Sequence, residues 1–542
     1  MQFRDVFRTW PCAATMAAGT LVPVSVAEAS FDLQSLTVTD IQAGYAAGDF
    51  TAVDLTQAYL NQIETYNPYY NAWITIDSAG ALSAAAEADA YMTEFGSPGG
   101  LFGVPVAIKD PMDVQGLPTT AGSTAFSSAA GGVDIIPDTD SPIVGRLRDS
   151  GMIILGKTNV PDFSRSGTNS TSTLMGATKN AYDITRVPGG SSGGSGVAVA
   201  TGMAPLATAE ETGSSITNPA SASSLVGIRP TSGLVPITGV FPLAGTFRDV
   251  MGPLGKTVED AALMFDAIAG PTQDDLRTLD SGDKIPEGGY AANLSPGQLQ
   301  GSRIGVYGPG YNTVELAPET QELFGRELGV LEELGATLVA DPFEGTEWSD
   351  ALGRPFSGTF SYDVSRYLER LGPGAAFNSI EEYEALTGEN WYDIERMPNE
   401  TSMAEPILRS DLDDYLEYRT TLRRLFNEIM EDNELDALVM PQLAEPVPTL
   451  ESGDFISRTP GGMVNDMGIP GVVLPGGYFD DGTPFAMYFI GQQWEELSLL
   501  NLAYDYEQAT MHRINPTLIP EPASVALLGA GGLMLLRRRR AA

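Results

Sequence analysis

The sequence predicts an α/β/α sandwich built on a large mixed, mostly parallel β-sheet. The chain has 542 residues, of which 43% are hydrophobic, so it is long enough to bury a large core. Short apolar runs at 103–110, 204–210 and 301–308 end at a glycine or a charged residue, as buried strands do. Segments with apolar residues at helical spacing separate these runs. Strands that alternate with helices are typical of a sheet covered on both faces.

The first half of the chain follows this alternation. Residues 31–99 repeat small, apolar and polar residues every three to four positions, which predicts helices. After the strand at 103–110, residues 141–160 have a helical pattern followed by a second apolar run. The next helix begins after the run PGGSSGGSG at 188–196, where Ser191 or Ser192 is placed to cap it. The strand at 204–210 follows directly.

The second half repeats the theme. A strand at 301–308 leads into an amphipathic helix at 318–336 and a further strand at 337–343. Residues 345–436 are helical in pattern and rich in aromatic side chains, which predicts a region that covers the sheet. No repeat or linker divides residues 30–515, so we expect one domain.

Composition excludes several function classes. The 30 basic and 70 acidic residues give a formal charge of −40, which repels nucleic acid and anionic lipid. His512 and Cys12 are the single histidine and cysteine, so a Cys/His zinc site cannot form. A Ser-His-Asp triad would depend on His512 alone. We therefore expect chemistry without a metal, a cofactor or a nucleic-acid partner.

The N-terminal residues 1–29 predict a secretory signal peptide. Arg4 and Arg8 precede a mostly apolar stretch, which ends at Ala27-Glu28-Ala29. Basic, apolar and A-x-A segments in this order are typical of a signal peptide, here cut before Ser30. A buried helix is the alternative, although prolines and a glycine interrupt the stretch.

The C-terminal residues 516–542 predict a sorting tail. Pro520-Glu521-Pro522 precedes fourteen almost wholly apolar residues at 523–536, and four arginines follow at 537–540. This pattern resembles the PEP-CTERM tail of Gram-negative bacteria. The resemblance implies export, transient membrane anchoring through a short transmembrane helix, and removal by an exosortase. Such a protein is secreted or stays in the cell envelope; an ordinary membrane anchor is the alternative.

Lys109 is the candidate base for a serine nucleophile, because histidine and cysteine are scarce. It follows five apolar or proline residues, so its stem enters an apolar setting. A lysine with a pKa near 10.4 must lose about 2–3 units to be neutral near pH 7–8, which burial can supply. The alternative is that Lys109 forms a structural ion pair with Asp110.

A second serine-glycine cluster supplies the nucleophile and its surroundings. Thr212, Gly213, Ser214 and Ser215 precede Ile216, and consecutive backbone N–H groups in such a turn can converge on a developing oxyanion. The first cluster, 188–196, is not a linker, because an apolar run follows it at once, and it lacks the P-loop lysine. Both clusters therefore indicate ordered loops that hold serines near other backbone.

Together these motifs resemble the amidase-signature hydrolases. The segments GVPVAIKD, PGGSSGGSGVAVATG and EETGSSITNPA occur in the family's order and spacing, and weaker matches cover roughly residues 35–510. The resemblance implies that Lys109 is the neutral base, that Ser191 is a bridging serine after a cis peptide bond, and that Ser215 is the acylated nucleophile. It also implies an oxyanion hole from the N–H groups of residues 212–215 and a supporting role for Ser192.

Three residues depart from the family pattern. Glu211 stands where aspartate is common, although a subgroup that resembles bacterial peptide amidases has glutamate there. Thr217 stands where arginine is common. Ser214 replaces the glycine that usually precedes the nucleophile, so Ser214 is a second candidate for acylation. Ser215 keeps both the following Ile216 and the 24-residue separation from Ser191, which favours Ser215.

The expected function is a serine amidohydrolase that cleaves a carboxamide C–N bond through an acyl-enzyme. Its substrate is a small-molecule or peptide amide. The aminoacyl-tRNA amidotransferase branch is disfavoured, because an exported and strongly acidic protein would not meet tRNA. The alternative is a weakened or non-catalytic protein of the same fold that binds envelope or matrix material, which the departures at Ser214 and Thr217 would support.

Overall fold

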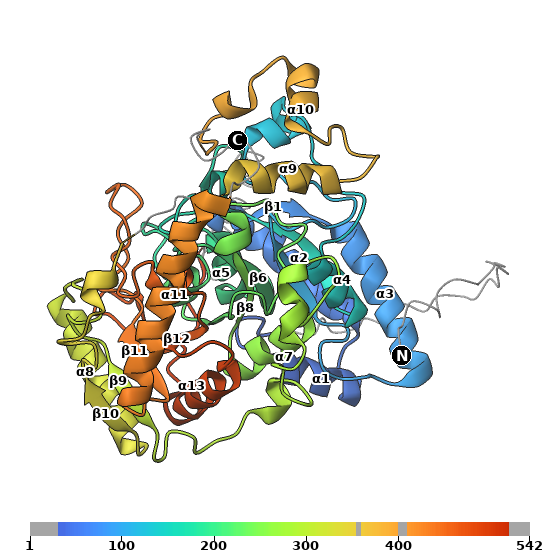
Figure 1. Cartoon of the computed structure of the whole chain (residues 1–542). Coiled ribbons are helices and arrows are strands. Elements are labelled where there is room, and N and C mark those ends of the chain that lie inside the picture. The colour runs from blue at the N-terminus through green and yellow to red at the C-terminus, as the bar shows by residue number, and fades with distance from the viewer. Residues whose placement is uncertain (1–30, 354–358, 399–408, 520–542) are drawn as a thin grey trace, which may run out of the picture.

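The computed structural model describes residues 31–353, 359–398 and 409–519 (Figure 1). The expected signal peptide at 1–29 and most of the expected tail, 520–542, lie outside the described residues. Within the described residues, no helix is long and apolar enough to cross a membrane.

One large mixed sheet forms the centre of the molecule. Within the described residues it contains eleven strands in the order β1-β3-β2-β6-β8-β7-β12-β13-β11-β9-β10. Parallel pairing joins β3, β2 and β6 at one end and β11, β9 and β10 at the other, and the strands between them pair antiparallel. The strands are β1 (Trp73–Ile76), β2 (Pro105–Lys109), β3 (Ile153–Thr158), β6 (Leu206–Glu211), β7 (Val226–Arg229), β8 (Val250–Gly255), β9 (Arg303–Val306), β10 (Thr337–Ala340), β11 (Ala437–Pro441), β12 (Gly471–Tyr478) and β13 (Pro484–Ile490).

Helices surround this sheet, as the alternating pattern predicts (Figure 1). They are α1 (Val38–Ala47), α2 (Ala52–Tyr70), α3 (Ser78–Phe95), α4 (Pro142–Asp149), α5 (Gly193–Ala200), α6 (Thr217–Ala222), α7 (Val258–Ile268), α8 (Pro318–Glu333), α9 (Phe360–Arg370), α10 (Ile380–Thr387), α11 (Arg409–Asp432), α12 (Met463–Met467) and α13 (Glu496–Thr510). Reciprocal side-chain caps begin α1 and α2, where Thr37 pairs with Asp40 and Thr51 with Asp54. The short strand β1 interrupts the segment 31–99, for which the sequence pattern predicts helices alone.

The small residues of α5 let this helix lie in the interior. All eight of its residues are buried. A Cβ atom at Gly194 would lie 2.4 Å from the carbonyl oxygen of Asn159, so the backbone approach leaves no room for a side chain. The helix packs against β2, which ends with Lys109, and against β6, which precedes the turn at 212–215.

Helices α9 and α10 form a lobe above the sheet, coloured yellow-orange in Figure 1. A second hydrophobic cluster joins this lobe to loops of the main body, and its large members include Phe126, Phe163, Phe241, Phe360, Tyr383 and Trp391. The described parts of 345–436 are thus largely helical, and residues 360–397 border the loops that follow β2 and β3.

Candidate active site

Lys109 ends strand β2, and its side chain is fully buried. Its Nζ atom lies 2.7 Å from Oγ of Ser191 and 3.0 Å from Oε2 of Glu210. Asp110, the neighbouring acid, does not pair with Lys109 and instead accepts hydrogen bonds from the backbone N–H and hydroxyl of Thr120. The structure therefore places Lys109 against the predicted bridging serine and against an acid that the sequence pattern did not single out.

Burial controls the protonation of this pair. Burial lowers the pKa of Lys109, and the negative charge of Glu210 opposes that shift. Burial likewise raises the pKa of Glu210, and Lys109 opposes that shift. Both shifts favour the uncharged form of each group. The neutral amine is the form that a general base requires.

The serine-glycine loop brings Ser191 to Lys109. The peptide bond between Gly190 and Ser191 is cis. A Cβ atom at Gly190 would lie 2.3 Å from the carbonyl oxygen of Asn169, so this position accepts only glycine. The hydroxyl of Ser170 donates to the carbonyl oxygen of Ser191 at 3.0 Å and accepts from the N–H of Gly193 at 2.9 Å. These contacts hold the Ser191 backbone on both sides.

Ser192 holds the same loop to strand β6. It is the N-cap residue of α5, but its side chain makes no capping hydrogen bond. Its hydroxyl donates to the carbonyl oxygen of Glu210 and accepts from the N–H of Glu210, each at 3.3 Å. The expected side-chain cap is therefore wrong, because the β6 backbone competes successfully for the hydroxyl.

Ser215 lies in the turn between β6 and α6, beside a cavity of about 220 Å³. Thr212, Gly213 and Ser215 line this cavity, whereas Ser214 is 2% exposed and is not among its described lining residues. In the described part of the chain, the backbone N–H groups of residues 212–215 have no acceptor, and the hydroxyl of Ser215 has no hydrogen-bond partner. The groups of Thr212, Gly213 and Ser215, which line the cavity, are therefore available to a molecule in it.

Ser214 adopts a φ of 93°, in the region that favours glycine. The side chain that replaces the usual glycine is thus tolerated at the cost of backbone strain, of the order of 1–3 kcal/mol for such positions. The turn keeps the geometry of a glycine position although the residue is serine.

Glu211 anchors the helix α6, which follows the turn at 212–215. Its Oε2 accepts hydrogen bonds from the N–H groups of Ile216 at 3.0 Å and Thr217 at 3.2 Å. Its Oε1 lies 3.1 Å from Nε of Arg229 and accepts from the side-chain amide of Asn465 at 2.8 Å. A buried carboxylate with four such partners is fully satisfied, so the glutamate is well accommodated here.

Known proteins resemble this chain in sequence and in fold. A sequence model of the amidase family matches residues 54–500. The chain belongs to the amidase family. The native peptide amidase from Stenotrophomonas maltophilia superposes on it with a TM-score of 0.78 at 31% identity, over 90% of this chain and all of that chain. An amidase family protein from Bacillus anthracis gives a TM-score of 0.74 at 26% identity, over 90% and 93%.

Sequence relatives agree with this assignment. A glutamyl-tRNA(Gln) amidotransferase subunit from Alkaliphilus metalliredigens is 31% identical over 499 residues, 88% of this chain and 96% of that protein. The expected amidase-signature fold is confirmed.

The sequence of this amidase-family chain does not indicate that three of its arginines belong to the candidate site. Arg165, Arg248 and Arg458 line the cavity that contains Ser215. They come from loops far apart in the sequence, so no local pattern reveals them. The sequence gives a weak indication of Glu210, because two consecutive glutamates at the end of an apolar strand are unusual.

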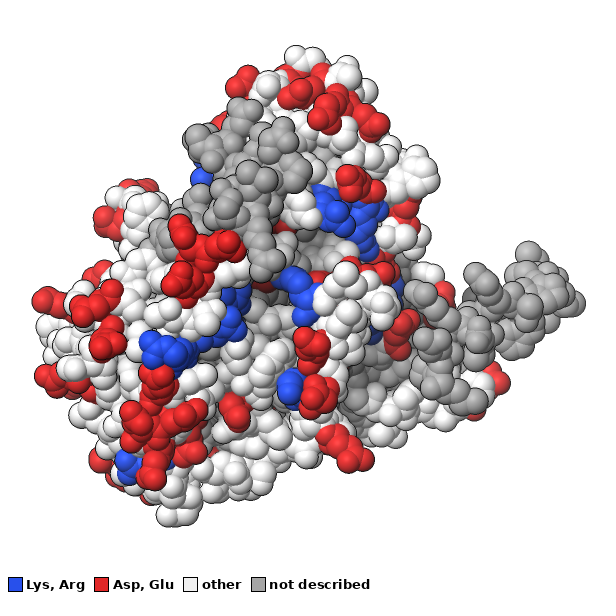
Figure 2. All heavy atoms as spheres, viewed as in Figure 1, with Lys and Arg blue, Asp and Glu red and all other residues white. Residues whose placement is uncertain are grey.

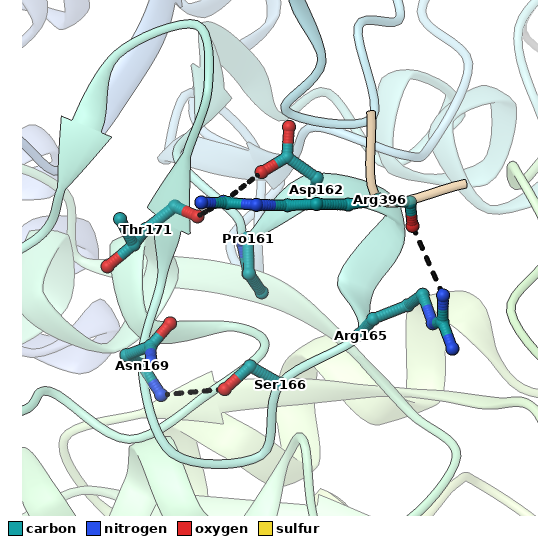
Figure 3. A pocket seen from close by; sticks show the side chains of 7 residues that line it. All are labelled: Pro161, Asp162, Arg165, Ser166, Asn169, Thr171 and Arg396. Carbon is teal, nitrogen blue, oxygen red and sulfur yellow. Dashed lines mark hydrogen bonds and ion pairs between the residues drawn. The ribbon is translucent and has the colours of Figure 1, made fainter. Parts of the chain in front are cut away.

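A second cavity, of about 480 Å³, adjoins the first through Arg165 and Ser166, which line both (Figure 3). Arg396 of the covering region reaches across it and lies 2.6 Å from Oδ2 of Asp162. Arg165 donates to the carbonyl oxygen of Arg396 at 3.2 Å, so the wall of the main body meets the covering region here.

His512 lies at a different place in the fold. Its Nε2 is 2.9 Å from Oε2 of Glu327, and it lines a separate cavity beside Lys256 and Glu507. The single histidine is thus engaged with a carboxylate of α8, away from the Ser215 cavity.

Proposed function

We propose that this member of the amidase family is a serine amidohydrolase that cleaves a carboxamide C–N bond through an acyl-enzyme on Ser215. The observation that carries the proposal is the contact of 2.7 Å between the buried amine of Lys109 and the hydroxyl of Ser191. Ser215 lies in the turn that ends the neighbouring strand and faces the cavity. This arrangement offers a base, a relay and a nucleophile without histidine.

The proposed reaction moves one proton along this relay. Oγ of Ser215 attacks the amide carbonyl carbon, its proton passes to Oγ of Ser191, and the proton of Ser191 passes to Nζ of Lys109. The N–H groups of residues 212–215 stabilise the oxyanion. Collapse of the tetrahedral intermediate breaks the C–N bond, and the leaving amine takes the proton back through Ser191. Water then attacks the ester by the same route and frees Ser215.

A fluorophosphonate probe tests this proposal. We expect the probe to label the purified chain at Ser215, located by peptide mass spectrometry, and Ser215→Ala to abolish labelling. Ser214→Ala is the matched control and should keep it. Lys109→Ala should lower kcat/KM by about 10²–10⁴-fold, as the loss of a general base does. Labelling at Ser214 would overturn the assignment of Ser215 as the nucleophile, and no labelling of the folded chain would favour the non-catalytic binding protein.

The substrate class that we propose is a peptide or small-molecule amide. The likeness to a peptide amidase supports it, with a TM-score of 0.78. The amidotransferase relative is equally identical at 31%, so identity does not choose between the two. The formal charge of −40 disfavours a tRNA partner, because phosphate recognition needs a basic surface.

We also propose that the protein is exported from a Gram-negative cell and processed by an exosortase. The order of basic, apolar and A-x-A segments at 1–29 and the Pro-Glu-Pro, apolar and arginine segments at 516–542 support this. Transient anchoring by the tail and release into the envelope or medium would follow.

A further inference from the structure

The lining of the Ser215 cavity is positively charged, whereas the chain as a whole is strongly acidic. The chain has 70 acidic and 30 basic residues, yet the cavity is lined by Arg165, Arg248 and Arg458, with no aspartate or glutamate among its described lining residues. Figure 2 shows blue side chains along the hollowed middle of one face, whereas red side chains dominate its outer parts. Because acidic residues outnumber basic ones by more than two to one, charged residues drawn at random from this chain would more often be acidic.

The three arginines differ in how far their charge is neutralised. Arg248 lies 3.1 Å from Oδ1 of the buried Asp466, so its charge is largely offset. Arg165 is exposed and donates to the carbonyl oxygens of Arg396 and Met397, and it forms no ion pair with a carboxylate of the described residues. Carbonyl acceptors orient a guanidinium but leave its charge in place.

Arg458 stands beside the proposed oxyanion turn. Its guanidinium donates to the carbonyl oxygen of Gly213, and a Cβ atom at Gly167 would lie 3.4 Å from its Nη1. The side chain thus lies between the loop that follows β3 and the loop that follows β6, and it is only partly exposed. A guanidinium that is already held in place loses less side-chain entropy when it binds a ligand.

Asp249, an acid that contacts Thr212 of this turn, is not among the described residues that line the cavity. Asp249 accepts from the hydroxyl of Thr212 at 2.5 Å and from the N–H groups of Leu243, Ala244 and Gly245. Its oxygens are thus engaged by the protein itself and are not free to accept hydrogen bonds from Arg165 or Arg458.

We propose that the Ser215 cavity binds a carboxylate carried by the substrate, so that the preferred substrates are amides with a carboxylate near the scissile bond. Arg165 and Arg458 are its binding residues. This inference rests on the proposed amide hydrolysis and adds a specificity to it. A guanidinium binds a carboxylate through two parallel hydrogen bonds, which fixes the orientation of the ligand as well as its charge. The carboxylate can belong to the acyl part or to the leaving amine, and matched substrates separate these positions.

Matched substrate pairs test the inference. Succinamate carries the charge on the acyl side, and butyramide is its neutral analogue with a methyl group in place of the carboxylate. N-acetyl-β-alanine carries the charge on the amine side, and N-propylacetamide is the corresponding neutral analogue. We expect kcat/KM for at least one anionic member to exceed that of its neutral partner by about tenfold or more, mainly through KM, as for hydrogen bonds to charged groups. Equal kcat/KM within both pairs would overturn the inference while leaving amide hydrolysis intact.

Arginine variants locate the effect. Arg165→Gln and Arg458→Gln should each lower the ratio of anionic to neutral kcat/KM by about tenfold, and Arg165→Lys should lose less. Arg424→Gln is the control, because Arg424 is exposed on α11 and pairs with Glu428 at 2.6 Å. An unchanged ratio in Arg165→Gln and Arg458→Gln would overturn the assignment of these residues.

A binding measurement separates this inference from the proposed function. Succinate should bind to the Ser215→Ala chain in calorimetry, and Arg165→Gln in that background should weaken its binding about tenfold. This result would support the carboxylate site even if no amide were hydrolysed and no probe reacted. Absence of succinate binding together with equal use of both substrate pairs would overturn it.

Discussion

At the scale of single residues, the site depends on Glu210. Lys109 would be an ordinary buried amine without it, but the carboxyl group lies 3.0 Å from Nζ and also accepts from the hydroxyl of Ser164 at 3.0 Å. Glu210 is a positioning residue in this proposal, since it contacts the base and not the reacting carbon. Its charge raises the pKa of Lys109 against the lowering caused by burial.

The opposing effects of burial and of Glu210 on the pKa of Lys109 predict how kcat/KM changes with pH. A general base must be unprotonated, so kcat/KM should rise with pH through the pKa of Lys109. Glu210→Gln removes the negative charge, lowers the pKa of Lys109 and should move the acidic limb of the profile to lower pH by about 1 unit or more. Glu434→Gln, an acid that follows α11 on the surface, is the control. An acidic limb that stays in place or moves to higher pH would contradict this role for Glu210.

At the scale of elements, buried helix α5 sets the distance between the serine loop and the sheet. Its glycines allow the backbone to lie against Asn159 and Ser223, where a methyl group would clash. The loop before it carries Ser191 and Ser192, and the strand beside it carries Glu210. A shift of this helix would therefore move the relay away from Lys109.

Two glycine-to-alanine changes in helices test the packing of α5. Gly194→Ala would place Cβ 2.4 Å from a backbone oxygen, so we expect a loss of a few kcal/mol of stability and a fall in kcat/KM of at least tenfold. Gly325→Ala in α8 meets no atom within 4 Å and should stabilise the chain by about 1 kcal/mol. Urea unfolding and amide hydrolysis measure both effects. Equal behaviour of the two variants would show that close packing of α5 is not required.

At the scale of the whole molecule, the charge of the outer surface differs from that of the cavity. The formal charge of −40 gives a strongly acidic exterior, whereas the Ser215 cavity is positive. A substrate carboxylate is then repelled by the outer surface and attracted at the cavity, so the local field favours this one site.

The proposed export predicts the mass of the mature protein. Expressed at full length in a Gram-negative host with an exosortase, the protein should begin at Ser30 and lack its arginine cluster at 537–540. Intact-mass spectrometry of the envelope and medium fractions measures this. A variant with Ala27→Arg should keep its N-terminal segment, because the small residues before the cut are lost. If the protein without substitutions keeps residues 1–29 in its mature form, the predicted signal peptide is wrong.

The sequence by itself determined the fold class and brought forward Lys109, Ser191, Ser192 and the turn at 212–215. This was possible because each motif is local: an apolar run ending in lysine, a glycine loop, and a turn after a strand. It also predicted strands and helices that the structure contains at 103–110, 204–210 and 318–336. It did not predict the antiparallel centre of the sheet, since pairing joins strands such as β7 and β12 that are far apart along the chain.

Only the tertiary structure decided which glutamate meets Lys109. Glu210 and Glu211 are neighbours in β6, and neighbouring strand residues point to opposite faces. The parallel pairing of β2 with β6 directs Glu210 toward Lys109 and leaves Glu211 to Arg229 and α6. The positive cavity has the same origin. Arg165, Arg248 and Arg458 converge there because three separate loops end at one place, and the order of residues along a chain does not contain that distance.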